Sequence, residues 1–161
     1  MSLAIDMTLE DAFDKYHQLV YYDAFRLTHS HHTAEDVVQH VFEKLCQREA
    51  PFVTHNHLRR WLMKVEKNKC IDILRERKKL EDSIDVSDAN LGIDELPIQD
   101  VVAVKEAIFM LPEPQFTAFA LSCICGYPNR EAAEMTGTNE NTVKSRVKAA
   151  RKKIESMVGG V

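Results

Sequence analysis

The sequence predicts an all-α protein with two small helical domains joined by an acidic linker. Three observations lead to this fold class. The 161 residues include only five Gly and five Pro, which favours helix. Apolar residues recur with helical spacing in both halves, and residues 80–100 lose that spacing and gather Asp, Ser, Asn, Gly and Pro. The predicted domains are therefore residues 1–79 and 101–161, with a linker at residues 80–100.

The first half predicts a three-helix bundle. Thr8 and Asp11 have the spacing of a capping box, and Thr33 and Asp36 form a second start of the same kind. A third helix is expected at about residues 57–79, with Trp61 on its apolar stripe and in the core. The stripe behind the second start comprises Ala34, Val37, Val38, Val41, Phe42 and Leu45.

The second half predicts four helices and ends in a helix-turn-helix. Helices are expected at about residues 98–111 and 115–125, the latter ending at Gly126. Asn129 is expected to cap a short helix, Gly137 to make the turn, and Thr138 to open a last helix to about residue 157. A short helix, a Gly-containing turn and a longer helix form the helix-turn-helix signature. The apolar stripe expected for the last helix is Val143, Val147, Ala150, Ile154 and Met157.

The net charge of −4 hides a strong segregation of charge along the chain. Residues 59–79 carry nine basic and three acidic residues, and residues 141–153 carry six basic and none acidic. Residues 80–100 carry seven acidic residues and no basic one. Two basic helices separated by an acidic segment indicate two candidate nucleic-acid contacts.

The last helix has what a DNA-reading helix needs, namely an apolar face, amide or hydroxyl groups near its start, and cations for phosphates. The alternative is a solvated basic helix packed through Val143 and Val147. The basic third helix, with Trp61, is of the kind that grips a phosphate backbone and stacks unpaired bases. Its alternative is a structural helix whose Trp61 belongs to the core.

The second helix carries an acidic face opposite its apolar stripe. The face comprises Asp36, Gln39, His40 and Glu43. An acidic face does not bind DNA, so it is either solvent surface or a docking face for a protein, and composition alone favours plain surface.

No cofactor, metal site or catalytic constellation is expected. The four cysteines form no C-x-x-C pair and are interpreted as small buried hydrophobic residues in a reducing compartment. The patch of His29, His31 and His32 is interpreted as a solvated turn before the second helix. The chain has neither an apolar run of about 18 residues nor a secretory signal, so a cytoplasmic protein is expected.

Several segments, in order, resemble the extracytoplasmic-function group of bacterial sigma factors. Residues 34–42, AEDVVQHVF, are similar to the core-polymerase-binding helix of sigma factors. Trp61 and Leu62, followed by Asn68, Asp72 and Arg75, resemble the minus-ten helix of the group. Residues 107–115 and 129–154 resemble its minus-thirty-five domain. The resemblance covers about residues 8–157.

The resemblance implies a promoter-recognising subunit of RNA polymerase, with chemistry left to the polymerase. The acidic face of Asp36, Gln39, His40 and Glu43 would bind the coiled-coil clamp of the largest polymerase subunit. The third helix and the loop at residues 48–57 would melt the minus-ten element and capture an extruded base. The linker would thread toward the RNA exit path, and an anti-sigma factor would be the usual regulator.

The DNA-binding residues are also implied by the resemblance. The minus-ten set comprises Arg59, Arg60, Lys64, Lys67, Asn68, Arg75 and Lys78. The minus-thirty-five set, expected in the major groove of promoter DNA, comprises Arg130, Asn141, Thr142, Lys144, Ser145, Arg146, Lys148 and Arg151.

Three residues depart from the family pattern. Phe116 stands where the family usually has Arg, and Glu66 and Lys69 replace small or apolar residues beside Asn68, so an unusual minus-ten preference is expected. Two other functions stay open. One is a stand-alone helix-turn-helix regulator whose residues 1–79 sense or dimerise, and the other is a degenerate homologue that titrates an anti-sigma factor. An enzyme is the least favoured class.

Overall fold

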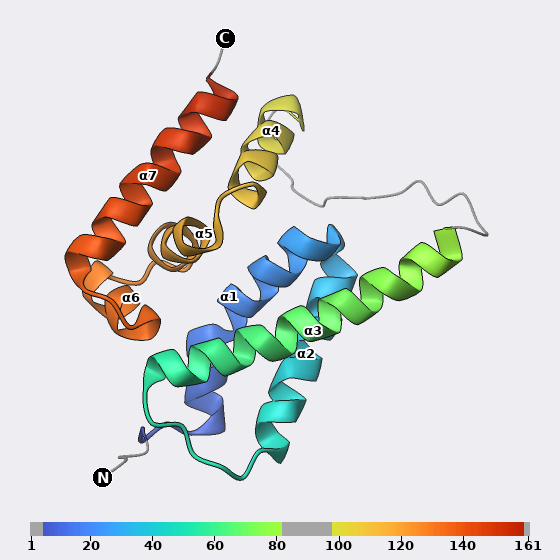
Figure 1. The fold of residues 1–161 in the computed structure, drawn as a ribbon, viewed down its shortest axis with the longest axis vertical. Helices are drawn as coiled ribbons and strands as arrows, with labels where there is room; N and C mark the ends of the chain where they lie inside the picture. The colour runs from blue at the N-terminus through green and yellow to red at the C-terminus, as the bar shows by residue number, and fades with distance from the viewer. Residues whose placement is uncertain (1–4, 82–97, 160–161) are drawn as a thin grey trace. The chain divides into compact units, whose positions relative to one another are not determined.

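The computed structural model describes residues 5–81 and 98–159, and every regular element in these ranges is helical (Figure 1). The predicted all-α fold class is confirmed. The chain divides into two compact units, Met1–Gly92 and Ile93–Val161. The expected linker at residues 80–100 falls almost entirely outside the described residues. No helix in the described ranges has the length and apolarity that crossing a membrane requires.

Helix α1 spans Leu9–Thr28 and begins with the predicted capping box. The Asp11 backbone N–H donates to Thr8 Oγ1 at 3.1 Å, and the Thr8 N–H donates to Asp11 Oδ2 at 3.3 Å. The helix ends at His29, whose φ of 54° is left-handed and whose N–H donates to Phe25 O at 2.8 Å. Thr8 and Asp11 thus satisfy two of the amides that a helix start leaves unpaired.

Helix α2, His31–Gln47, begins two residues earlier than predicted. The Thr33 N–H donates to Ser30 Oγ at 3.2 Å, so Ser30 is the N-cap. Starting the helix at Thr33 was wrong, and so was assigning His31 and His32 to a turn, because both lie in the first turn of α2. Ser30 carries a capping hydroxyl equivalent to that of Thr33, and local sequence did not distinguish between them.

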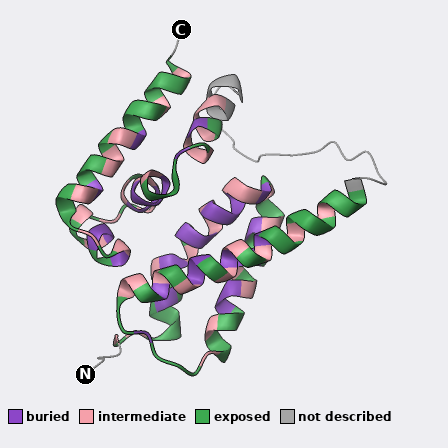
Figure 2. Cartoon of the chain, in the orientation of Figure 1, coloured by how far each residue is buried: buried purple, intermediate pink, exposed green. Residues whose placement is uncertain are grey.

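Helix α3, His55–Glu81, completes the three-helix bundle. Its buried face includes Leu58 and Leu62, which join core residues from the other two helices (Figure 2). Trp61 is only half-buried, so its placement in the core was wrong. Glu66, which is fully buried, continues the inner face of α3 instead. The core residues of α1 and α2 include Tyr16, Leu19, Val20, Val37 and Val41.

The second unit is built around helix α7, Glu140–Val158. Against it pack α4, Ile98–Phe109, α5, Glu113–Phe119, and α6, Asn129–Thr136. The helix expected at residues 115–125 starts two residues earlier, and its second half, Ala120–Ile124, is a π-helical turn named η1. The core comprises Ala107, Leu111, Phe116, Leu121, Met135, Val143 and Ala150, among others.

The helix-turn-helix is confirmed as α6 and α7, with two corrected caps. Asn129 is the first residue of α6, and its Oδ1 accepts a hydrogen bond from Ser122 Oγ at 3.2 Å. Gly137 has the left-handed φ of 68° that the turn requires. Asn139, not Thr138, caps α7, because the Thr142 N–H donates to its Oδ1 at 2.8 Å.

The apolar stripe of α7 is narrower than predicted. Val143 and Ala150 are buried, Val147 and Ile154 are half-buried, and Met157 is 45% exposed. Placing Met157 on the packed stripe was therefore wrong. The last turn of α7 packs less completely than its middle, where the other helices of the unit cover it.

Candidate nucleic-acid interface

The acidic face predicted on α2 lies at the surface. Asp36, Gln39 and Glu43 are exposed, and His40 is half-buried. Gln39 Nε2 donates to Glu43 Oε1 at 3.3 Å, and His32 Nε2 lies 3.6 Å from Asp36 Oδ2. Burial and then the nearby Lys69 and Lys44 cations lower the pKa of His40, which keeps it neutral at neutral pH.

An apolar groove of about 710 Å³ runs beside this face between α1 and α2. Its aromatic lining comprises Phe13, His17, Tyr21, Tyr22 and Phe42, and Gln39 and Glu43 also line it. Phe13 is 41% exposed, although its ring contacts that of Phe42 with centroids 5.0 Å apart. The acidic face is therefore continuous with exposed aromatic surface, as at the centre of many protein interfaces.

The seven minus-ten candidates on α3 divide into one group of six and one outlier. With 3.6 residues per turn, Arg60, Lys64, Lys67, Asn68, Arg75 and Lys78 share one side of the helix. Ile71 and Leu74 lie on the same side and are 45% and 37% exposed. Arg59 points about 100° away from Arg60, and its Nη2 donates to Asn56 Oδ1 at 3.0 Å. The structure thus groups six of the seven minus-ten candidates and separates Arg59.

The loop between α2 and α3 holds an aromatic cluster that the sequence analysis missed. The Arg48 guanidinium lies 4.3 Å from the Phe52 ring centroid and 5.2 Å from that of Trp61. Phe52 is T-shaped against both Trp61 and His57. Cation–π stacking of this kind orders a loop that has no regular structure. No sequence period could reveal it, because the rings meet only when the loop folds back onto α3.

Helix α7 presents its polar residues on one exposed side. Asn141, Lys144, Ser145, Lys148 and Arg151 are all exposed, and helical geometry places them on adjacent positions of one face. The two other candidates on α7, Thr142 and Arg146, are half-buried and lie around the helix toward its packed side. Thr142 Oγ1 donates to Asn139 Oδ1 at 3.0 Å, so it also takes part in the cap.

Arg130 lies on α6 and is exposed. A basic groove of about 840 Å³ separates the segment at residues 122–129 from α7, and Lys144, Lys148 and Arg151 line it. Arg151 Nη2 donates to the Cys123 sulfur at 3.5 Å. Cys123 and Cys46 are exposed, so the interpretation of all four cysteines as buried was wrong. Lys152 also lines the groove, and Glu155 is its one acidic lining residue. The excess of cations along α7 suits the groove to an anionic backbone.

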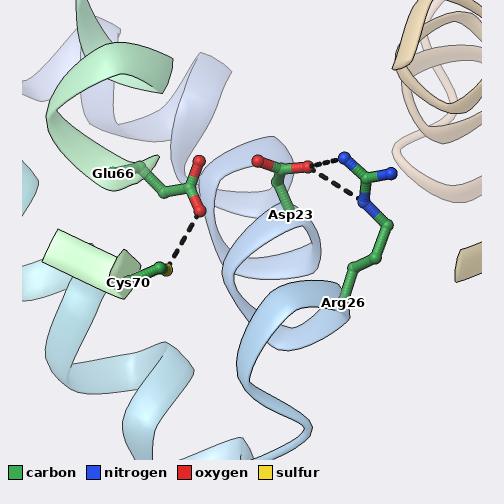
Figure 3. Close-up of polar contacts among 4 residues, drawn as sticks. All are labelled: Asp23, Arg26, Glu66 and Cys70. Carbon is green, nitrogen blue, oxygen red and sulfur yellow. Dashed lines mark hydrogen bonds and ion pairs between the residues drawn. The ribbon is translucent and has the colours of Figure 1, made fainter. Parts of the chain in front are cut away.

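Two of the departures from the family pattern lie inside the molecule. Glu66 and Phe116 are buried, and Lys69 is half-buried on α3. Because it is buried, Glu66 is not placed to touch DNA directly, and the unusual minus-ten preference stays a prediction. A charged residue at an inner position of an amphipathic helix is the signal that could have predicted its burial. Figure 3 shows its surroundings.

Two family models match the chain in sequence order. Sigma-70 region 2 matches residues 12–80, which hold the three-helix bundle, and Sigma-70 region 4 matches residues 102–154, which hold the helix-turn-helix. Together they cover most of the chain.

Relatives with known names are similar over almost the whole chain. RNA polymerase sigma factor SigZ of Bacillus subtilis is 27% identical over 157 residues, which span 96% of this chain and 89% of that protein. ECF RNA polymerase sigma factor SigM of Mycobacterium tuberculosis is 26% identical over 93% of this chain and 76% of that protein. A co-crystal structure of sigma factor RpoE with anti-sigma factor NepR from Bartonella quintana matches with a TM-score of 0.49 and 27% identity, over 88% of this chain and 90% of that chain. With both regions matched in order, this chain belongs to the sigma-70 family, in its extracytoplasmic-function group.

Proposed function

We propose that the protein is an alternative sigma factor that binds core RNA polymerase, recognises and melts specific promoters, and so starts transcription. The observation that carries the proposal is the succession of region 2 and region 4 along one chain. A promoter specificity factor acts inside the cell, so the protein would work in the cytoplasm. Its own role would be binding and positioning, with RNA synthesis left to the polymerase.

The docking site for the polymerase would be the acidic face of α2. Exposure of Asp36, Gln39 and Glu43 supports this assignment, as does the neighbouring aromatic groove. Charged and amide side chains at the rim would orient a coiled-coil partner, and exposed aromatic rings would supply contact area. His40, held neutral by its surroundings, would add a hydrogen-bonding group without a charge.

Promoter DNA would be bound by two separate surfaces. The basic side of α3 and the Arg48 loop would hold the melted minus-ten strand, because cations next to exposed apolar and aromatic side chains suit unpaired bases. The exposed side of α7 would enter the major groove of the minus-thirty-five element. We assign binding of the minus-ten element to a domain at residues 1–79. Binding of the minus-thirty-five element is assigned to a second domain at residues 101–161.

Core-polymerase binding tests this function directly. The wild-type protein should co-elute with bacterial core RNA polymerase, and the Asp36→Arg, Gln39→Ala double variant should not. Glu140→Arg is a matched control, because it reverses one exposed charge on α7, outside both the acidic face and the aromatic groove. Loss of co-elution in the control as well, or binding retained by the double variant, would contradict the assigned docking site.

A stand-alone helix-turn-helix regulator is the second candidate, favoured by the complete basic face of α7. Such a protein would bind duplex DNA tightly without polymerase. The net charge of −4 disfavours this behaviour, since non-specific DNA affinity depends on a cationic surface. Selection of duplex DNA by the purified protein alone, with no binding to polymerase, would establish this candidate.

Regulation by an anti-sigma factor is also part of the proposal, because that is the usual arrangement in the group. The inhibitor would cover the same surfaces that polymerase and DNA need. Affinity purification from the native cell before and after induction should recover such a partner in the uninduced state. Recovery of polymerase alone in both states would contradict it.

A further inference from the structure

A pair of buried carboxyl groups lies inside the three-helix bundle, between α1 and α3 (Figure 3). Asp23 on α1 is 1% exposed, and Glu66 on α3 is fully buried. Asp23 Oδ1 accepts hydrogen bonds from Arg26 Nε at 3.1 Å and Nη2 at 2.7 Å. Glu66 Oε1 accepts one from the Cys70 thiol at 3.2 Å. One oxygen of each carboxyl group is therefore accounted for.

The second oxygens, Asp23 Oδ2 and Glu66 Oε2, lack a donor from the described part of the chain if both groups are ionised. Two carboxylates cannot satisfy each other, since an ionised carboxyl group only accepts hydrogen bonds. Burying unpaired acceptors and a second negative charge disfavours the folded state strongly. A single proton removes both penalties, because a protonated carboxyl group can donate its O–H to the other.

We propose that Asp23 and Glu66 share one proton at neutral pH, carried by Glu66 and donated to Asp23, and that this hydrogen bond joins α3 to α1. Asp23 holds the negative charge because the Arg26 guanidinium bonds to it. Among the described residues, Glu66 has the neutral Cys70 thiol as its other hydrogen-bond partner. The proposal concerns the bundle itself and does not depend on what the protein binds.

The surroundings favour the protonated form of Glu66. Burial, followed by the hydrogen bond and negative charge of Asp23, raises the pKa of Glu66 to about 10, against smaller opposing effects of Cys70 and Lys67. Burial and the neighbouring Glu66 raise the pKa of the Cys70 thiol, which therefore remains a donor, and Arg77 opposes this shift. Helix α2 contributes only apolar side chains to its buried face, namely Ala34, Val37, Val41 and Phe42.

This proton makes the stability of the bundle depend on pH. The folded state holds a proton that Glu66 releases on unfolding, where its pKa is near 4.5. The stabilisation is complete below that value and is lost as pH rises toward the folded pKa of about 10. Within the window, one released proton raises the unfolding equilibrium constant by up to about tenfold for each pH unit.

Glu66→Gln in the full-length protein tests the pH dependence. The Gln amide can donate to Asp23 and accept from Cys70 without a titrating proton. We expect the ratio of the wild-type to the variant unfolding constant to rise toward about tenfold per unit between about pH 6 and about pH 9. Fluorescence of Trp61, the single tryptophan, reports unfolding of this unit. Parallel pH profiles for the two proteins would overturn the proposal.

Infrared spectroscopy tests the proton itself. At neutral pH, the difference spectrum between wild type and Glu66→Gln should contain the carbonyl stretching band of a protonated carboxylic acid. Cys70→Ala should keep this band, because Asp23 remains the acceptor, and Asp23→Asn should shift its frequency. A folded wild-type protein without the band would overturn the proposal. Neither test uses polymerase or DNA, so failure here leaves the proposed function untouched.

Discussion

The side-chain oxygen of Asn139 caps the start of α7. Its Oδ1 accepts from the backbone N–H of Thr142 at 2.8 Å and from the Thr142 hydroxyl at 3.0 Å. The cap leaves Asn141 exposed in the first turn, where a DNA-reading helix contacts base edges. The capping residue Asn139 and the proposed promoter-contacting residue Asn141 are thus only two positions apart.

Asn139→Ala should destabilise the second unit. Loss of the cap is expected to cost about 1 kcal/mol, because the Thr142 amide loses its acceptor. Thermal unfolding by circular dichroism, with amide hydrogen exchange in α7, would measure the change. Thr138→Ala is the matched control, since its hydroxyl contacts Thr136 and does not cap α7. Equal destabilisation by both substitutions would refute the assigned cap.

Lys144→Ala and Asn141→Ala should affect promoter binding in different ways. Lys144 would contact phosphate, so its loss should weaken binding to all minus-thirty-five sequences. It should also reduce the slope of log affinity against log salt concentration by about one. Asn141 would contact a base edge, so its loss should change preference at one position by about 1–3 kcal/mol. Binding of polymerase holoenzyme to a panel of promoter variants separates the two. A uniform loss for both variants would refute the assigned roles.

At the scale of the elements, Arg77 ties the end of α3 to the junction of α1 and α2. Its Nη1 donates to the Thr28 carbonyl at 2.7 Å, and its Nη2 donates to Thr33 Oγ1. Thr28 lies at the C-terminus of α1, where carbonyl groups lack helical partners. The bond therefore holds the proposed minus-ten helix against the helix proposed to dock polymerase.

Arg77→Ala should destabilise the three-helix bundle by roughly 1.5–3 kcal/mol, because a charged donor to a buried carbonyl is lost. Chemical denaturation followed by Trp61 fluorescence measures this unit. Arg75→Ala is the control, since Arg75 is exposed on the basic side of α3. The control should leave the free energy of unfolding nearly unchanged. A larger loss from Arg75→Ala would contradict this account.

At the scale of the whole molecule, two modest DNA contacts on one chain should reinforce each other. Once the first unit binds, the predicted linker would raise the effective concentration of the second. The seven acidic charges of residues 80–100 also keep the linker from competing for DNA. Strong promoter binding should therefore need both units on one chain, rather than high affinity in either.

Cutting the linker tests this coupling. A protease site inserted between residues 82 and 97, cleaved after purification, should weaken promoter binding of the holoenzyme by roughly 10²- to 10⁴-fold. The same protein left uncut is the control, and competition with labelled promoter DNA supplies the affinities. Unchanged affinity after complete cleavage would show that the units do not cooperate through the chain.

The sequence by itself determined the elements and their faces. Helical periodicity, the capping box at Thr8 and the turn glycine at Gly137 predicted the fold class and the helix-turn-helix, because these signals act within one or two turns of chain. Charge segregation similarly predicted which helices carry basic faces. The sequence did not determine the N-cap residues of α2 and α7. Thr33 and Thr138 carry side chains that can cap a helix as well as those of Ser30 and Asn139, which are the caps in the structure.

Only the tertiary structure decided what happens where helices meet. The burial of Glu66 beside Asp23 joins two helices that are far apart in sequence, and the half-exposure of Trp61 depends on how the loop with Arg48 and Phe52 folds onto α3. A periodic pattern predicts which side of a helix is apolar, but not which residues of other helices pack against that side. The proton proposed between Glu66 and Asp23 follows from that partner, because burial and then the neighbouring carboxyl group favour the neutral acid.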